Sequence, residues 1–150
     1  MAKEIEQVLE FHKVFEHPIG DVAKALSIKR GLQRHSYMKE ELQEFHDAVE
    51  SQDLVEQADA CIDIIYFALG TLVELGLSDK YEALFANIQA SNISKVCLSM
   101  ESAIRTAEAH DQPTTIKPIG SYWKVSDANT NKIVKSETYF KPNLKEIINS

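Results

Sequence analysis

The run 62-IDIIYFALGTLV-73 constrains the fold of this chain more than any other feature of its sequence. Apart from Asp63, its residues are apolar nearly all round a helix. A helix of this kind normally lies in the centre of a domain, where neighbouring elements bury it. The run is interrupted by an aspartate and is too short to span a membrane. It therefore predicts a buried central helix in a soluble protein.

Helical periodicity continues on the N-terminal side of this run. Helices are expected over 2–16 and over about 28–50, and the apolar run belongs to a third helix over 53–75. Asp53 is a suitable N-cap for that third helix, and Gly76 is a natural stop after it. Because the loop between the second and third helices is short, these two helices should be antiparallel neighbours.

Shorter elements are expected beyond residue 76. They are a helix over 79–91 capped by Ser78, a helix over 99–110, and a terminal helix over 144–148. The β-prone stretches 121–127 and 132–139 flank the turn-rich 128-ANTN-131, which predicts a β-hairpin. The expected architecture is one all-α domain, a bundle of four to five helices with a small C-terminal hairpin. Its helical core spans about 2–110, and the hairpin and tail span about 119–150.

Composition excludes several classes of protein. A chain of 150 residues with 44% hydrophobic and 26% charged residues suits one globular domain with a real core. The net charge of −7 argues against binding nucleic acid through a broad basic face. Cys61 and Cys97 form no metal-binding pattern and are too few for a disulfide framework. No secretory signal is evident, so a cytoplasmic location is expected.

Acidic residues gather on the second and third helices. A helix turns about 100° per residue, so the acids on the second helix share an arc of roughly 100° and those on the third an arc of roughly 60°. Antiparallel pairing can bring the two arcs together around one small volume. The six acids are Glu40, Glu41, Glu44, Glu56, Asp59 and Asp63.

Two explanations compete for this pattern. The EExxE cluster of the second helix, taken alone, is typical of a solvated helix face. The third helix argues otherwise, because Asp63 is flanked by isoleucines and a buried unpaired carboxylate costs several kcal/mol. No lysine or arginine lies within 53–79, so its partner is a metal ion or a basic residue from elsewhere, such as Arg34 or Lys95. The argument favours metal, and oxygen-only ligands favour Mg²⁺ or Mn²⁺.

The ordered motifs resemble the MazG-like branch of the all-α nucleoside triphosphate pyrophosphohydrolases, which also include dimeric dUTPases and phosphoribosyl-ATP pyrophosphohydrolase. The family signature of EExxE followed by ExxD is similar to 40-EELQE-44 and 56-EQAD-59. The segments 58–77, 91-SNISKV-96 and 132-KIVKSETYFKP-142 are similar to three further elements of that branch. The resemblance implies Mg²⁺-dependent cleavage between the α and β phosphates of a nucleotide, giving the monophosphate and pyrophosphate.

The resemblance also implies roles for the acids. The candidate ligands or water activators are Glu40, Glu41, Glu44, Glu56 and Asp59, and Glu41 or Glu44 would lie beside the attacking water. Asp63 precedes Ile-Ile-Tyr much as a ligand aspartate does in related enzymes. Asp63 is therefore an alternative ligand, in place of Asp59 or alongside it. Asp59 is favoured, because only Asp59 meets the ExxD spacing.

Contacts with substrate are also implied by the resemblance. Asn92 and Lys95 are expected to touch phosphates, and Arg34 to touch phosphate or brace an acid. His12, which follows Phe11 in the first helix, is expected at the edge of a base pocket. Lys135 is expected to reach the substrate or a neighbouring subunit.

The sequence thus predicts a nucleotide pyrophosphohydrolase with Mg²⁺, or Mn²⁺ in its place, acting on nucleoside triphosphates. Its expected role is the cleaning of nucleotide pools, with deoxynucleotides preferred. A homodimer or a dimer of dimers is expected, because the family assembles and so few helices leave apolar surface uncovered. The alternatives are hydrolysis of phosphoribosyl-ATP or another nucleotide derivative, and a non-catalytic helical module that binds metal or nucleotide.

Overall fold

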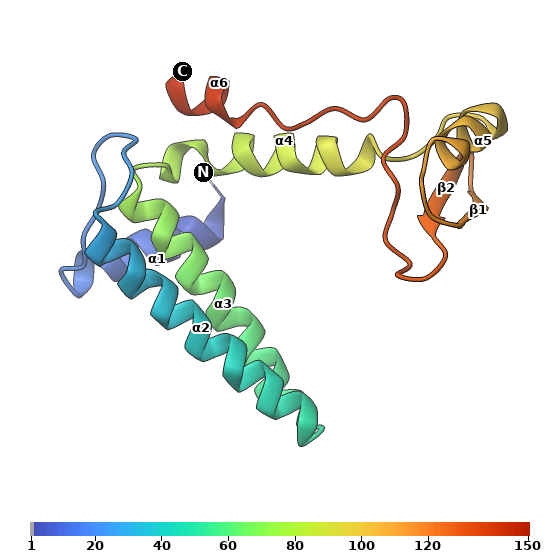
Figure 1. Cartoon of the computed structure of the whole chain (residues 1–150). Helices are drawn as coiled ribbons and strands as arrows, with labels where there is room; N and C mark the ends of the chain where they lie inside the picture. Colours follow the sequence, from blue (N-terminus) through green and yellow to red (C-terminus); the bar gives the residue numbers. More distant parts are fainter. Residues whose placement is uncertain (1) are drawn as a thin grey trace. The chain divides into compact units, whose positions relative to one another are not determined.

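The computed structural model describes residues 2–150 and contains two compact units. One unit is Met1–Glu82 with Ile148–Ser150, and the other is Ala83–Ile147. Six α-helices and one two-stranded antiparallel sheet make up the regular structure of the described residues (Figure 1). The predicted class, a helical protein with a small C-terminal hairpin, is therefore confirmed.

Three helices build the first unit: α1 (Lys3–Val14), α2 (Ile28–Glu50) and α3 (Leu54–Glu74). Figure 1 shows α2 and α3 running side by side from the loop that joins them. Arg34 donates to the carbonyl of Phe67, and Gln57 donates to the carbonyl of Ala48. Positions rise along α2 as their partners fall along α3, so the predicted antiparallel pairing is confirmed.

Local capping explains where these helices begin and end. The Asp53 carboxylate accepts hydrogen bonds from the amides of Val55 and Glu56, as expected of the N-cap of α3. The hydroxyl of Ser27 accepts from the amide of Arg30 at the start of α2. Gly76 adopts a φ of +69° just beyond α3, which confirms the predicted stop.

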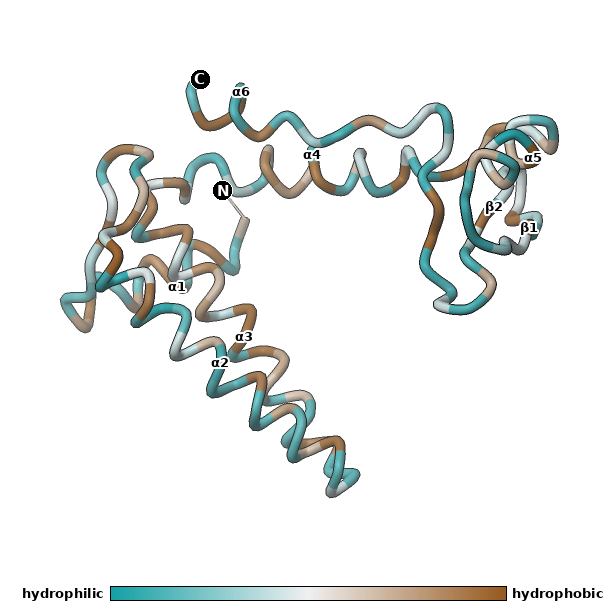
Figure 2. Tube along the Cα trace, in the orientation of Figure 1, coloured by the Kyte–Doolittle hydropathy of each residue, from teal (hydrophilic) through white to brown (hydrophobic). Residues whose placement is uncertain are grey.

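Apolar side chains of α1 and α3 form the core of the first unit. Those fully buried are Ile5, Val8, Leu69 and Val73. The N-terminal half of the apolar run is not covered, because Ile62 is 61% exposed and Ile65 is 52% exposed. The expectation that the whole run is buried is therefore wrong for one chain. The apolar residues nonetheless continue along α3 beyond its contact with α1 (Figure 2).

The helix α2 shows the same pattern. Its buried residues are Arg34 and Ala48, whereas Leu32, Leu42 and Val49 are exposed. We refer to Leu32, Leu42 and Val49 of α2, with Ile62 and Ile65 of α3, as the exposed apolar residues of α2 and α3. Among the described residues no single helix meets the length and hydropathy expected of a membrane span; α3 and the segment Ser78–Ile93 meet them only as a bent pair.

Replacing Gly76 with alanine is expected to destabilise the first unit by about 2 kcal/mol or more. A Cβ at Gly76 would lie 2.3 Å from the carbonyl oxygen of Val22, and the backbone there has positive φ. The measurement is the free energy of unfolding in urea. Gly31→Ala is the control, since Gly31 lies inside α2, a Cβ there would lie 3.9 Å from the Cβ of Leu26, and alanine should stabilise the helix by about 0.5–1 kcal/mol. Equal effects of the two changes would contradict the packing described here.

A short 3₁₀ turn, η1 (Ser78–Lys80), leads into α4 (Tyr81–Ile93). Ser78 therefore starts this turn and is not the N-cap of an α-helix, which corrects the prediction. The second unit continues with α5 (Met100–Glu108) and ends near α6 (Leu144–Asn149). Its core consists of buried side chains with Trp123 packed against them, namely Cys97, Ala103 and Val125.

The predicted hairpin exists, but the residue range predicted for one of its strands was wrong. β2 (Tyr122–Asp127) pairs with β1 (Thr114–Ile119), which comes before it, and not with 132–139. The reason is the loop, because Gly120 and Ser121 form a two-residue connection with positive φ at Gly120, as in tight hairpin turns. Segment 132–139 adds only a bridge at Ile133 to the other edge of β2.

Candidate active site

The antiparallel register places Glu41 opposite Asp63. Glu41 lies between Arg34 and Ala48 on α2, and Asp63 lies between their respective partners, Phe67 and Gln57, on α3. Both acids are half-buried. The structure thus brings the two predicted arcs of acids together at this point of the α2–α3 pair.

Glu41 is the most perturbed of the six acids. Burial, followed by the charges of Glu44, Asp63, Glu40 and Asp59, raises the pKa of the Glu41 carboxyl. Its Oε2 atom is buried and makes no hydrogen bond to the described residues. An unpaired carboxylate oxygen in such surroundings destabilises the fold, because both burial and neighbouring negative charges disfavour the ionised form. A bound cation would remove both penalties.

The other acids lie at different distances from this centre. Glu40, Glu44 and Asp59 are exposed, yet each contributes to the raised pKa of Glu41. Glu56 does not appear among these contributors; it is exposed in the first turn of α3, seven residues or about 10 Å along the helix from Asp63. Five of the six predicted acids therefore share one electrostatic neighbourhood.

This donor set fits a hard divalent cation. Its members supply only carboxylate oxygens, which suit Mg²⁺ or Mn²⁺, and the buried Oε2 of Glu41 has no other partner in the described chain. The carboxylate oxygens of these acids lie farther apart than the ligands of one metal ion do. Within residues 2–150, a different group of side chains has three ligand atoms that all lie within 4.8 Å of one another.

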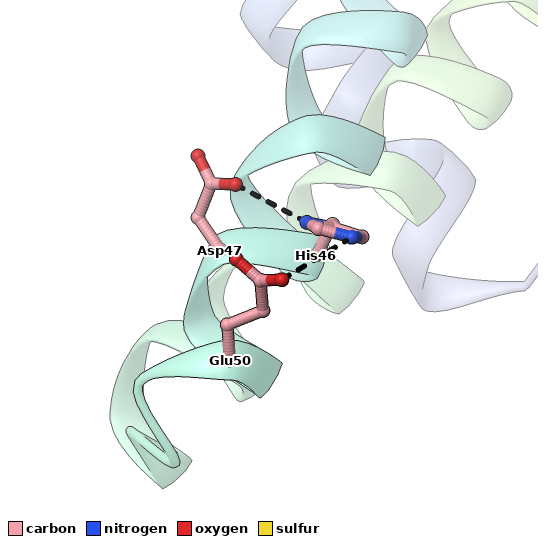
Figure 3. A group of neighbouring side chains, drawn as sticks. All are labelled: His46, Asp47 and Glu50. Atoms are coloured by element: carbon pink, nitrogen blue, oxygen red, sulfur yellow. Dashed lines mark hydrogen bonds and ion pairs between the residues drawn. The ribbon is translucent and has the colours of Figure 1, made fainter.

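That group is His46, Asp47 and Glu50, near the end of α2 (Figure 3). His46 Nδ1 lies 3.3 Å from Asp47 Oδ1, and Nε2 lies 3.9 Å from Glu50 Oε1. All three side chains are exposed, and Gln43 also donates to Asp47. The group is accounted for as a hydrogen-bonded cluster on a helix surface.

An aromatic pocket of about 210 Å³ lies beside the acids on the same pair of helices. Tyr37 is one helical turn from Glu41 on α2, and Phe67 is one turn from Asp63 on α3. The rings of Tyr37 and Phe67 are 5.4 Å apart. The remaining lining residues come from α1, the loop after it, α2 and α3, and are Phe11, His12, His17, Arg34 and Tyr66.

His12 presents an unprotonated nitrogen in this pocket. Its Nδ1 lies 2.8 Å from the carbonyl oxygen of Pro18, and a carbonyl can only accept, so Nδ1 carries the hydrogen. Burial lowers the pKa of His12, although the bond to Pro18 opposes this effect, so the ring is neutral near pH 7. Nε2 is then a hydrogen-bond acceptor next to Gly70, where a Cβ would lie only 2.9 Å from it.

Arg34 is held by an acid outside the cluster. Its Nη1 lies 3.4 Å from Glu74 Oε1, its Nε donates to Thr71, and its Nη2 donates to the carbonyl of Phe67. Arg30 forms a bidentate pair with the same Glu74, with both distances 2.7 Å. The structure therefore places Arg34 in the wall of the aromatic pocket, bracing Glu74.

The other predicted substrate contacts belong to the second unit. Lys95 Nζ donates to Asn92 Oδ1 at 2.7 Å, so these two side chains share one face at the end of α4. The ammonium of Lys135 lies 4.9 Å from the ring centroid of Tyr139. These contacts describe the second unit alone.

The sequence interpretation missed the aromatic walls formed by Tyr37, Tyr66 and Phe67. A signal for two of them was present, because Tyr37 and Phe67 each lie four residues from a central acid, on the side away from the α2–α3 loop. At that spacing a side chain shares a helix face with the acid. An acid and an aromatic ring repeated in this way on paired helices indicate adjacent polar and apolar halves of one site.

Comparison with known families agrees with this arrangement. Residues 8–92, more than half of the chain, match the family described as phosphoribosyl-ATP pyrophosphohydrolase. The match includes both central acids and the aromatic pocket, and no curated protein matches the chain. The resemblance found in the motifs is thereby confirmed. The chain belongs to the phosphoribosyl-ATP pyrophosphohydrolase family, within the MazG-like superfamily of divalent-metal-dependent nucleotide pyrophosphohydrolases.

Proposed function

We propose that this protein hydrolyses nucleoside triphosphates, with deoxynucleotides preferred, to the monophosphate and pyrophosphate. The observation that carries the proposal is the position of the half-buried Glu41 one helical turn from Tyr37. Carboxylates that can hold cations suit the phosphates of a nucleotide, and the adjoining aromatic pocket suits its base. The role proposed in the cell is the cleaning of nucleotide pools.

The chain's own residues supply positioning and proton transfer. Glu41 accepts a proton from the water whose oxygen attacks the α-phosphorus, while the bond from that phosphorus to the bridging oxygen breaks and pyrophosphate leaves. Glu44 is the second candidate for orienting this water. Tyr37 and Phe67 hold the base, and His12 Nε2 accepts a hydrogen bond from it.

Mg²⁺, with Mn²⁺ as a substitute, would be held by carboxylates of this cluster and would neutralise phosphate charge and activate the water. The proposed ligands are Glu40, Glu41, Glu44, Glu56, Asp59 and Asp63. Asn92, Lys95 and Arg34 remain proposed contacts to substrate, and so does Lys135, on the basis of the motifs alone.

A second candidate substrate is phosphoribosyl-ATP, because the matching family carries that description. The deciding experiment incubates the protein and Mg²⁺ with deoxynucleoside triphosphates, nucleoside triphosphates and phosphoribosyl-ATP, and identifies the products. Release of pyrophosphate with the monophosphate from deoxynucleotides supports the main proposal. Turnover of phosphoribosyl-ATP alone favours the second candidate. Metal binding without turnover of any compound would indicate a non-catalytic binding module.

Mg²⁺ should raise the melting temperature of the wild-type protein more than that of Asp63→Asn. Asp63 acts on Glu41 more strongly than Asp59 does, so its removal should relieve repulsion in the metal-free protein and weaken stabilisation by the cation. Thermal melts with and without Mg²⁺ on wild type, Asp59→Asn and Asp63→Asn measure both effects. Asp79→Asn, an exposed acid of η1, is the control. Equal shifts in wild type and Asp63→Asn would remove Asp63 from the proposed ligands.

We also propose that the chain forms a homodimer or a dimer of dimers through the exposed apolar residues of α2 and α3. Isolated apolar side chains on a surface need no explanation, but several on one pair of helices indicate a surface that a partner covers. These residues flank the acids on the same two helices. Such an assembly would therefore also shield the site from water.

The mass in solution is expected to be at least twice the 16.9 kDa of one chain. Ile62→Glu should shift it toward the monomer, since a charge in an apolar interface is costly. Light scattering after size-exclusion chromatography gives the mass. Leu98→Glu is the matched control, because Leu98 is 62% exposed and Ile62 is 61% exposed. A wild-type mass of one chain would refute the proposed assembly.

A further inference from the structure

A cavity of about 610 Å³ lies wholly within the second unit. Its volume falls in the range of about 300–1,000 Å³ typical of sites for small molecules. The helix α5 forms one wall, and the turn after β2 and the segment 132–137 form the others. The helix itself contributes Arg105 and Thr106, and the turn that follows it contributes Ala109 and His110.

Several separate interactions hold these walls in place. The Ser136 hydroxyl donates to the carbonyl of Ser94 at 2.8 Å. The amide of Val134 donates to the carbonyl of Val125 at 2.9 Å. The Arg105 guanidinium donates to both oxygens of Glu137 and so joins α5 to the facing segment. The cavity is therefore formed by the fold before any ligand enters it.

Both acids that line the cavity are already paired. Asp127 Oδ1 accepts from the amides of Asn129 and Thr130 and from the Thr130 hydroxyl, and Oδ2 lies 3.4 Å from His110 Nε2. These bonds lower the pKa of Asp127 to about 2, with the Thr130 amide the largest cause. Glu137 is paired with Arg105. The Arg105 guanidinium thus neutralises Glu137, whereas Asp127 is an ionised carboxylate held by the donors of its own turn.

Two lysines of the same lining have no carboxylate partner. Lys132 makes no ion pair within residues 2–150, and the ammonium of Lys135 lies over the Tyr139 ring. The lining therefore carries three cationic side chains against two carboxylates, in a chain of net charge −7. Two ammonium groups without a carboxylate partner are donors that suit the oxygens of a phosphate.

Three residues of the lining are apolar. Ala109, Ile133 and Val134 contribute aliphatic surface beside the lysines, and Ile133 is 39% exposed. We propose that this cavity is a second ligand site, which takes a small organic phosphate with an apolar body the size of a nucleoside. The body packs on the aliphatic wall, and the phosphate meets Lys132 and Lys135. The proposed hydrolysis guides only the choice of nucleoside monophosphates as probes.

Isothermal titration calorimetry in EDTA tests the proposal. Without divalent cations the acids around Glu41 repel phosphates, so binding there is suppressed and no turnover occurs. Deoxyadenosine and deoxycytidine monophosphate are titrated, beside inorganic phosphate and butyrate. We expect one saturable site for a nucleoside monophosphate, about tenfold or more weaker in Lys132→Glu. The measurement does not involve hydrolysis, so its failure is separate from failure of the proposed activity.

Lys117→Glu is the matched control, since it makes the same charge change on β1 outside the cavity and should leave the affinity unchanged. Ala109→Phe, which fills the cavity, should also weaken binding. It serves as the deciding variant if circular dichroism shows that Lys132→Glu is unfolded. Absence of binding, or affinity insensitive to both cavity variants, overturns the proposal. Inorganic phosphate binding as tightly as a nucleoside monophosphate also overturns the proposal, since the aliphatic wall would then contribute nothing. Butyrate binding as tightly as a nucleoside monophosphate overturns it too, since the cavity would not select phosphate.

Discussion

Replacing Glu41 with glutamine is expected to lower metal-dependent release of pyrophosphate by about 10²–10⁴-fold and to leave the fold intact. Glutamine keeps the shape of the side chain but can neither accept the proton of the attacking water nor neutralise a cation. The loss should appear in kcat, because substrate still reaches the aromatic pocket formed by Tyr37 and Phe67. Initial rates over a range of nucleotide concentrations measure it.

The same substitution should stabilise the metal-free protein near neutral pH. The folded-state pKa of Glu41 is raised, so ionised Glu41 opposes folding. The wild-type protein should therefore gain stability as the pH falls from neutral toward the ordinary glutamate pKa of about 4.3, and lose it as the pH rises through the raised value. Glu41→Gln should lack this part of the pH dependence. Urea unfolding in EDTA across that range shows the difference.

Glu50→Gln is the control for both measurements. Glu50 lies on the same helix and is exposed, and among residues 2–150 its carboxylate lies within ion-pairing distance of His46 alone, at 3.9 Å. It should change neither the rate nor the stability appreciably. Full activity in Glu41→Gln would remove Glu41 from the proposed mechanism. Lower stability of metal-free Glu41→Gln would show that the carboxylate is satisfied in the fold.

Replacing Glu74 with alanine is expected to destabilise the first unit by about 3–5 kcal/mol. The side chains of Glu74 and Arg34 are 1% and 5% exposed, so the change leaves a buried guanidinium without its counter-charge. The two arginines respond differently to this acid. The hydrogen bonds that Arg30 donates to Glu74 raise the pKa of this more exposed arginine, whereas burial lowers the pKa of Arg34 despite Glu74. The free energy of unfolding measures the loss.

Glu137→Ala is the matched control, because Glu137 also forms a bidentate pair with an arginine. That pair is open to water, with 58% and 45% of the Arg105 and Glu137 side chains exposed, and it should contribute little. Glu74→Gln, which keeps the shape, serves as a milder variant if Glu74→Ala does not fold. Equal effects of Glu74→Ala and Glu137→Ala would contradict the importance assigned to burial.

Features that depend on neighbouring residues could be predicted from the sequence. The start of α3 after Asp53 and its end before Gly76 follow from local capping, and α2 occupies the predicted range Ile28–Glu50. The strand partner of β2 was misjudged for a related reason. Two β-prone stretches flank that strand, and the choice between them depended on the tighter loop at Gly120.

The candidate site could be predicted only in part. The six acids were identified as a group, but their spacing left the order of importance open. The environment of Glu41 separates them, since Asp63 and Asp59 act on it and Glu56 does not appear among the causes. The pairing of Arg34 with Glu74 could not be foreseen, because these residues are 40 positions apart and meet only through the antiparallel register.

The sequence by itself determined the helices, the acids and the family motifs, because periodicity, caps and motif spacing involve residues a few positions apart. Only the tertiary structure decided that Glu41 faces Asp63, that Tyr37 and Phe67 form a pocket beside them, and that Arg34 belongs to its wall. These relations depend on the register between two helices. That register comes from the joint packing of many side chains, and no single segment encodes it.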